Sequence, residues 1–273
     1  MANIERPLEA QAMDTLWQQL REQALTLSER NPILKAHLEQ RVLRHASFHE
    51  ALASHLALQL QPQAGEVDLS RWFTTLIEAT PGICAGATAD ITRVVTLNPA
   101  CPNHLSAFLT FRGIQAVQAH RIAHSLWSHG DATSAVLLQN WAANCWAIDI
   151  HPAARLGKGL FVDHGIGLVI GETAIVEDEV SLWHGVTLGS TLGEAGVRHP
   201  HVRRGALVCA GATVLGNIEV GENAIVAANA VVLKPVTAGS VVAGTPARVV
   251  GQAPSSLATI SHSPDMTQPE ARQ

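Results

Sequence analysis

Aliphatic side chains return at every sixth position through the second half of the chain. A period of six fits neither an α-helix, with about 3.6 residues per turn, nor the two-residue alternation of a half-buried strand. Short parallel strands stacked into triangular coils satisfy it, with three hexapeptides per coil and about 4.8 Å between coils. The pattern predicts a parallel β-helix with inward side chains at Ile150, Leu156, Val162, Leu168, Ala174, Val180, Val186, Val202, Val208, Val214, Val220, Val226 and Val232.

The repeat is interrupted once. Its register slips between Val186 and Val202, and the residues in between are rich in Gly and include Arg198 and His199. An insertion into a repeat array forms a surface loop, and loops on a rigid scaffold are common places for binding and catalysis. We therefore expect a functional loop at residues 188–201.

The first half of the chain has a helical pattern instead. Apolar residues recur four apart after Asn31 and Pro32, an N-cap and first-turn pair, and predict one long amphipathic helix that extends to residue 60. The other expected helix starts are Asp68, Asn103 for a helix to about His129, and Asp131, which follows the stop signal Gly130.

These patterns together predict an α+β fold in three parts. Residues 1–148 form an all-helical N-terminal domain, and residues 149–251 form the β-helix with its loop insertion. Residues 252–273 are rich in Pro, Ser and Gln without any period, so we expect a flexible C-terminal tail.

Composition narrows the function classes. The 273 residues carry a formal charge of −5 without basic blocks, so nucleic acid is not an expected partner. No apolar run is long enough to span a membrane, and the first residues lack an apolar signal core, so we expect a cytoplasmic protein without membrane association. The cysteines form no CxxC pair, which favours buried thiols over disulfides or metal ligands at Cys84, Cys101, Cys145 and Cys209.

Histidines are the main candidates for chemistry. His120 and His124 are spaced for zinc on a helix, but no third ligand accompanies them, and a surface or packing role is favoured, as for the equally spaced pair of His45 and His49. The candidates are those next to coil corners or the inserted loop, namely His151, His164, His184 and His199.

Asp163 and His164 directly follow an inward position of the repeat. A neutral imidazole can take a proton from an alcohol when a carboxylate such as Asp149 holds its tautomer, so a catalytic dyad competes here with a structural histidine. In the loop, Arg198 offers a planar bidentate cation for a substrate carboxylate beside His199, and a solvated loop charge is the alternative.

Several motifs together resemble serine O-acetyltransferase, within the hexapeptide-repeat acyltransferase superfamily. The resemblance covers almost the whole chain and includes VLLQN in the helical half. The motifs in the second half are DIHPAARLGKG (149–159), DHGIGLVIGETA (163–174), VTLG (186–189), RHP (198–200), LGNIEVG (215–221) and GTPARVVG (244–251).

The resemblance implies a left-handed β-helix that assembles into homotrimers or, through the helical domains, hexamers. It implies acetyl transfer from acetyl-CoA to the hydroxyl of L-serine for cysteine biosynthesis, without a metal. The position of His164 matches the general base and Asp149 the residue that orients it. Asp163 matches the binder of the substrate ammonium, Arg198 that of the carboxylate, and His199 completes the pocket.

The resemblance also implies where acetyl-CoA binds, in a groove between neighbouring β-helices. Backbone N–H groups near Gly189 and Ser190 would stabilise the tetrahedral oxyanion. The positions matched to cofactor binding are Gly189, Ser190, Thr191, Ala210, Ala228 and Arg248.

Three departures from the family pattern affect the expected specificity. Asn98 replaces an acidic residue that helps to hold the substrate amino group, and loss of such a charge-assisted bond costs about 1.5–3 kcal/mol. The Gly-rich loop reads Gly-Ser-Thr-Leu from Gly189, and His184 stands where Gln is common. The chain ends in Glu-Ala-Arg-Gln rather than the family's terminal Ile, so cysteine synthase is not an expected partner.

Three alternatives remain beside serine acetylation. Asn98 is compatible with another small hydroxy-amino acid such as homoserine as acceptor. A zinc-dependent hydratase shares the hexapeptide β-helix, although the repeat lacks a close pair of ligands. A non-catalytic scaffold is the third. Because cysteine inhibits the family through the serine pocket, Asn98 also predicts weak inhibition by cysteine.

Overall fold

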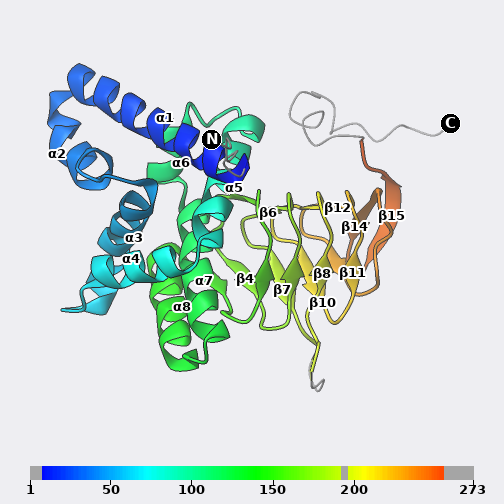
Figure 1. The fold of residues 1–273 in the computed structure, drawn as a ribbon. Helices are drawn as coiled ribbons and strands as arrows, with labels where there is room; N and C mark the ends of the chain where they lie inside the picture. Colours follow the sequence, from blue (N-terminus) through cyan, green and yellow to red (C-terminus); the bar gives the residue numbers. More distant parts are fainter. Residues whose placement is uncertain (1–7, 192–195, 255–273) are drawn as a thin grey trace, which may run out of the picture.

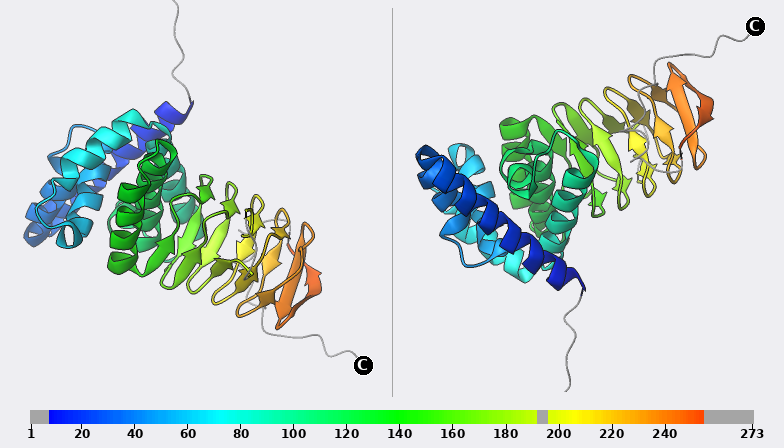
Figure 2. Two further views of the ribbon diagram at one scale, coloured as in Figure 1. Left: turned by 90° about the horizontal axis from the view of Figure 1, so that it is seen from below. Right: turned by 90° about the horizontal axis from the view of Figure 1, so that it is seen from above.

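The computed structural model describes residues 8–191 and 196–254 of the chain. A group of helices at one end is followed by a long three-sided β-helix, whose far end carries the last strands (Figures 1 and 2). The helical elements are α1 (Leu8–Arg30), a 3-10 turn (Pro32–Leu34), α2 (Lys35–Leu38), a π-helical turn (Glu39–Leu43), α3 (Phe48–Ala64), α4 (Leu69–Ala79), α5 (Gly82–Leu97), α6 (His104–Thr110), α7 (Arg112–Ser128) and α8 (Ala132–Trp146).

Three of the expected helix starts are confirmed by their caps. The side chains of Asp68, Asn103 and Asp131 each accept a hydrogen bond from the backbone N–H three residues later, which satisfies a donor that the first turn leaves unpaired. The helix α1 was not expected; it buries Leu16 and Leu20, four residues apart, on one face.

Two helices that were predicted to be continuous are each interrupted in the structure. The helix expected to extend to residue 60 stops before Ser47, whose hydroxyl accepts from the N–H of Glu50, while the Glu50 carboxylate accepts from the N–H of Ala46. This reciprocal capping box starts a new helix. The helix expected from Asn103 to His129 breaks at Phe111, which has an extended backbone and separates α6 from α7.

The β-helix consists of three parallel sheets, each contributing about one strand to every coil. We name them sheets A, B and C in chain order. Sheet A holds β1 (Ile148–Ile150), β4 (Leu168–Ile170), β7 (Thr187–Gly189), β10 (Thr213–Leu215) and β13 (Val231–Val232). Sheet B holds β2 (Arg155–Leu156), β5 (Ile175–Val176), β8 (His201–Val202) and β11 (Glu219–Val220). Sheet C holds β3 (Phe161–Asp163), β6 (Ser181–Trp183), β9 (Leu207–Val208), β12 (Ile225–Val226), β14 (Ser240–Gly244) and the antiparallel β15 (Ala247–Gln252).

The hexapeptide pattern is confirmed by burial. All of the expected inward side chains are buried except Leu156, which is half-buried. Their removal from water supplies the main stabilisation of the coils. The predicted fold class, an all-helical region followed by a parallel β-helix, is therefore confirmed.

The last coil ends in a hairpin. The segment from Gly244 to Arg248 joins β14 to β15 and contains a cis peptide bond before Pro246. Gln252, which was expected in the tail, belongs to β15, and the N–H of Ala253 donates to the carbonyl of Gly239. The rest of the tail, from residue 255, lies outside the described residues, as do residues 192–195 of the predicted loop.

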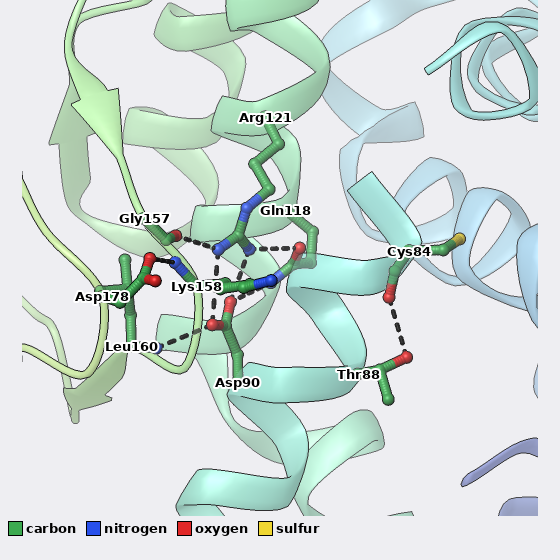
Figure 3. A network of polar contacts seen from close by, with 9 residues as sticks. All are labelled: Cys84, Thr88, Asp90, Gln118, Arg121, Gly157, Lys158, Leu160 and Asp178. Carbon is green, nitrogen blue, oxygen red and sulfur yellow. Dashed lines mark hydrogen bonds and ion pairs between the residues drawn. The ribbon is translucent and has the colours of Figure 1, made fainter. Parts of the chain in front are cut away.

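A buried polar network attaches the helical half to the β-helix (Figure 3). Asp90 of α5, which is 1% exposed, forms an ion pair with Arg121 of α7 at 2.5 Å and accepts from the backbone N–H of Leu160 at 2.8 Å. Arg121 also donates to the carbonyl of Gly157 at 2.6 Å. Because the buried carboxylate and guanidinium satisfy each other and the backbone of the β-helix, the two halves are held in one relative position.

Candidate active site

His164 lies at the turn where the chain passes from sheet C to sheet A, which we call the C-to-A edge. This turn needs left-handed backbone conformations, with φ of +53° at His164, and it stacks on equivalent turns of later coils. Gly185 and Gly211 each have a φ of +69° in these turns, a conformation that glycine adopts without steric cost. The turns are joined by backbone hydrogen bonds from Gly185 to Ile166 and from Gly211 to His184.

The ring of His164 is open to solvent and has polar neighbours. Its side chain is 73% exposed, and its Nε2 lies 3.9 Å from Oδ2 of Asp163. The ring of His184, from the next coil, contacts it edge-on with 5.9 Å between centroids. An exposed imidazole beside a carboxylate is available to a substrate that arrives at this edge.

A cavity of about 370 Å³ adjoins His164 at the junction with the helical half. It brings together three predicted site residues that are far apart in the sequence, namely Asn98, Asp163 and His164. Asn98 is the C-cap of α5, and its Oδ1 accepts the N–H of Ala100 at 2.9 Å, which shapes the loop on the helical side.

Arg112 also lines this cavity, and sequence reasoning missed it. It stands at the start of α7, directly after the break at Phe111. Since that break was not expected, the sequence placed Arg112 inside a continuous helix, and nothing marked it as a cavity residue. It adds a cation to a cavity that otherwise has Asp163 as its charged group.

Asp149 lies on β1 and points out of sheet A between two buried isoleucines. Its Oδ1 accepts a hydrogen bond from the amide of Gln139 in α8, at 2.6 Å. Within the described part of the chain no hydrogen bond joins Asp149 to His164, so their pairing stays a prediction. The His164 turn nevertheless stacks on this region, because the N–H of Gly167 donates to the carbonyl of Ala147 at 2.7 Å.

His199 lies at a different edge, where the chain passes from sheet A to sheet B, which we call the A-to-B edge. Its Nδ1 accepts from the backbone N–H of Thr173 at 3.2 Å, so in the neutral ring Nε2 carries the proton. Burial, helped by the charge of Arg198, lowers the pKa of His199 and keeps it neutral. A neutral donor suits the binding of an oxygen atom. The ring covers Gly171, where a Cβ would come within 2.0 Å of it.

Arg198 is paired with a residue that the sequence did not single out. Its guanidinium forms a hydrogen-bonded ion pair with Glu172, and this bond is the main reason why the pKa of Glu172 is lowered. The backbone N–H of Arg198 donates to the hydroxyl of Thr173 at 2.9 Å. Arg198 is thus held at the A-to-B edge.

The residues matched to cofactor binding divide between these two edges. Gly189 ends β7, and Ser190 and Thr191 follow it at the A-to-B edge. Ala210 and Ala228 lie at the C-to-A edge in the two coils after that of His184, and the N–H of Asn229 donates to the carbonyl of Ala210. Arg248 lies in β15 beyond them and is exposed.

One chain therefore carries two groups of candidate residues, separated by the width of sheet A. A strand of three residues spans roughly 10 Å, so His164 and His199 cannot act on one small substrate within a single chain. Asn98 and Asp163 belong with His164, while Arg198 and the segment from Gly189 belong with His199.

The described residues also bear on metal ligation and on the state of the cysteines. Among them, no group of three or more His, Cys, Asp or Glu side chains is arranged to hold a metal ion. Burial raises the pKa of Cys84 to about 12 and that of Cys209 to about 11. Cys101 is also buried, but Cys145 is only half-buried, which corrects the expectation for that residue.

No helix in the described ranges combines the length and apolar character needed to cross a membrane.

The chain is similar to known proteins over most of its length. The family model of the N-terminal region of serine acetyltransferase matches residues 16–119. A putative serine acetyltransferase of Schizosaccharomyces pombe is 50% identical over 244 residues, which cover 89% of this chain and 90% of that protein.

Two solved structures are similar over most of their length. Serine acetyltransferase from Brucella abortus in complex with coenzyme A has a TM-score of 0.86 and 41% identity, covering 90% of this chain and 98% of that one. Soybean serine acetyltransferase complexed with serine has a TM-score of 0.84 and 39% identity, covering 88% and 99%. The chain therefore belongs to the serine acetyltransferase family.

Proposed function

We propose that this protein transfers the acetyl group of acetyl-CoA to the side-chain hydroxyl of L-serine and releases O-acetylserine and CoA. The observation that carries the proposal is the cavity at the C-to-A edge, which combines an exposed imidazole with Asp163 and Asn98. An ammonium group fits beside Asp163, and the alcohol of the same small molecule then reaches His164.

His164 is proposed as the general base. Its imidazole takes the proton of the serine hydroxyl while the oxygen attacks the thioester carbonyl, so that a C–O bond forms and the C–S bond then breaks. The proton passes to the departing thiolate. Asp149 orients the ring and stabilises the imidazolium that forms during attack. In such a role His164 must remain accessible, as its 73% exposure allows.

The acceptor is proposed to be held at both of its charged ends. Asp163 and the Asn98 amide bind the ammonium, and Arg198 binds the carboxylate with the neutral His199 beside it. The names of the relatives favour serine over another hydroxy-amino acid as acceptor. Asn98 remains the residue that motivates a test of homoserine.

Acetyl-CoA is proposed to lie along the C-to-A edge. The turns at this edge present small residues, Ala210 and Ala228, in line with His164 and His184. A row of small side chains leaves room for an extended molecule that reaches from the far end, near Arg248, toward His164. The N–H groups near Gly189 and Ser190 are proposed to bind the oxyanion.

A complete site is proposed to need two chains. Because His199, Arg198 and Gly189 lie across sheet A from His164, a second chain that places its A-to-B edge against this C-to-A edge would complete the pocket. Cyclic contacts of this head-to-tail kind close into rings. The proposed ring is a homotrimer joined through its three β-helices, and pairing of two trimers through their helical halves would give a hexamer.

The proposal is tested by the release of free CoA. Purified protein with acetyl-CoA is expected to release CoA on addition of L-serine, and to do so more slowly with homoserine or other hydroxy-amino acids. Release of CoA with homoserine but not with L-serine would show that homoserine is the acceptor. An absence of release with every acceptor would reject the proposal.

A further inference from the structure

Asp149 has one side-chain hydrogen-bond donor among the described residues, and that donor is Gln139. The amide Nε2 of Gln139 lies 2.6 Å from Oδ1 of Asp149. Hydrogen bonds to an ionised acceptor are shorter and stronger than those between neutral groups. A bond to one carboxylate oxygen also restricts rotation of the group, so the direction of the second oxygen depends on this amide.

Gln139 and Asp149 are joined by a short and rigid piece of chain. Gln139 lies in the middle of α8, which ends at Trp146, and only Ala147 separates this helix from β1. Ala147 has a left-handed backbone, and its carbonyl accepts the N–H of Gly167 from the His164 turn. The amide, the carboxylate and the turn that carries the proposed base therefore have fixed positions relative to one another.

The other side of Gln139 borders a small internal cavity of about 10 Å³. Among the described residues, the only other polar side chain on its wall is that of His120, which is 4% exposed. A space of this size admits about one water molecule, which needs polar partners of the kind that His120 and Gln139 provide. Burial, more than any neighbouring charge, lowers the pKa of His120 to about 3, so the ring is neutral.

No ionised side chain from the described part of the chain lies on that wall to compete with Asp149 for the Gln139 amide. The rest of the cavity is lined by aliphatic side chains, which cannot accept a hydrogen bond. The carboxylate of Asp149 is thus the stronger acceptor within reach, and the amide is expected to stay on it.

We propose that Gln139 is a positioning residue, which holds one oxygen of Asp149 so that the other oxygen is presented to His164. The inference rests on the proposed pairing of Asp149 with His164. Gln139 touches neither substrate in this account, because it lies behind the carboxylate in α8. Its removal therefore lowers kcat through the orientation of Asp149 and leaves the KM values for serine and acetyl-CoA nearly unchanged.

The first variant to test is Gln139→Leu, with Asn140→Ala as the matched control, since Asn140 is the exposed neighbour on the same helix. Outer-shell partners that orient metal ligands typically contribute about 10–100-fold, and a similar factor is expected for a residue that orients a catalytic carboxylate. Gln139→Leu is expected to lower kcat by about this factor, whereas Asn140→Ala stays within about twofold of the parent. Circular dichroism and thermal melting establish that each variant is folded.

The second variant, Gln139→Glu, separates positioning from mere packing. Two carboxyl groups this close do not ionise together, so at low pH the pair holds a proton and the glutamic acid donates to Asp149 as the amide did. As the pH rises the proton is lost and repulsion displaces Asp149. The ratio of the variant's kcat to that of the parent is therefore expected to fall with increasing pH.

A simple charge effect on His164 would have the opposite sign. An added negative charge raises the pKa of a nearby imidazole, so the neutral base would be recovered, and the ratio would rise, with increasing pH. The other titratable or charged groups that face this pair are His151 beside Asp149, and Asp163, His184 and Arg112 around His164; they are present in the parent and in every variant.

The outcomes are distinct. A kcat for Gln139→Leu like that of Asn140→Ala, or a Gln139→Glu ratio that is flat or rises with pH, overturns the role of Gln139. Measurement of Asp149→Asn in parallel distinguishes a failure of the Gln139 inference from a failure of the proposed function. If Asp149→Asn retains full activity, the dyad itself is wrong; if it is impaired while the Gln139 variants are not, only the inference fails.

Discussion

Gly113 of α7 lies directly against Val162 of β3. A Cβ built on Gly113 would come 2.3 Å from the carbonyl oxygen of Val162 and 2.8 Å from its Cβ. Both residues line the cavity that holds Asp163 and His164, so this contact sets the distance between the helical half and the proposed base.

The Gly113→Ala substitution is expected to destabilise the protein, because backbone atoms cannot move aside as a flexible side chain can. Overpacking of this kind costs about 1–3 kcal/mol of unfolding free energy. Chemical denaturation measures it, with Gly82→Ala as the control, since a Cβ there meets nothing within 4 Å. Equal stability of the two variants would contradict the importance of the contact.

Asn98→Asp is expected to lower the KM for L-serine by about one to two orders of magnitude, because a carboxylate binds the ammonium more strongly than an amide. The turn is kept, since an aspartate can also accept the N–H of Ala100. The same variant is expected to be more sensitive to cysteine. Asn140→Asp controls for added charge, and an unchanged KM in Asn98→Asp would show that position 98 does not contact the substrate.

Unfolding stability is expected to decrease on acidification because two histidines are buried in neutral form. Burial lowers the pKa of His55 and of His120 to about 3. Between the ordinary histidine pKa of about 6.5 and this value, the unfolded chain binds protons that the folded chain does not. Each histidine therefore lowers the unfolding free energy by about 1.4 kcal/mol per pH unit in that window.

His120→Gln tests this dependence through the slope of unfolding free energy between pH 7 and pH 5. The variant loses one titrating group, so its slope is expected to be smaller than that of the parent by the contribution of one histidine. His49→Gln, at a half-buried position near the start of α3, serves as the control. A parent slope retained in His120→Gln would show that this residue is protonated equally in both states.

Mixing two inactive variants tests the sharing of the site between chains. His164→Ala and Arg198→Ala remove residues from opposite edges of sheet A, so each homo-oligomer is expected to be inactive. After joint unfolding and refolding, mixed oligomers contain some interfaces with both residues intact, and CoA release is expected to return in part. No recovery in mixtures whose mixed composition is established by mass spectrometry would place the whole site in one chain.

The coil architecture could be predicted from the sequence because its signal is local. Each inward aliphatic residue follows from the six-residue period, and burial from Val162 to Val232 agrees with it. The start of a new helix after Ser47 could also have been predicted, since Ser47 and Glu50 form a capping box. The break at Phe111 was not readable, because α7 is placed by its contact with Val162, far away in sequence.

The site was accessible from the sequence only in part. The resemblance singled out Asn98, Asp163 and His164, which the cavity brings together. The partners Gln139 and Glu172 were missed, because which donor or carboxylate lies opposite a side chain depends on how a helix meets a strand, or how two coils stack. Such pairings produce no periodic pattern in the sequence.

The most direct test of the account is the rate of CoA release by His164→Ala with acetyl-CoA and L-serine. Loss of a general base lowers kcat by about 10²–10⁴-fold, and that loss is expected here without unfolding, because the side chain is exposed. A folded His164→Ala protein with the parent's rate would contradict the assignment of the base at the C-to-A edge.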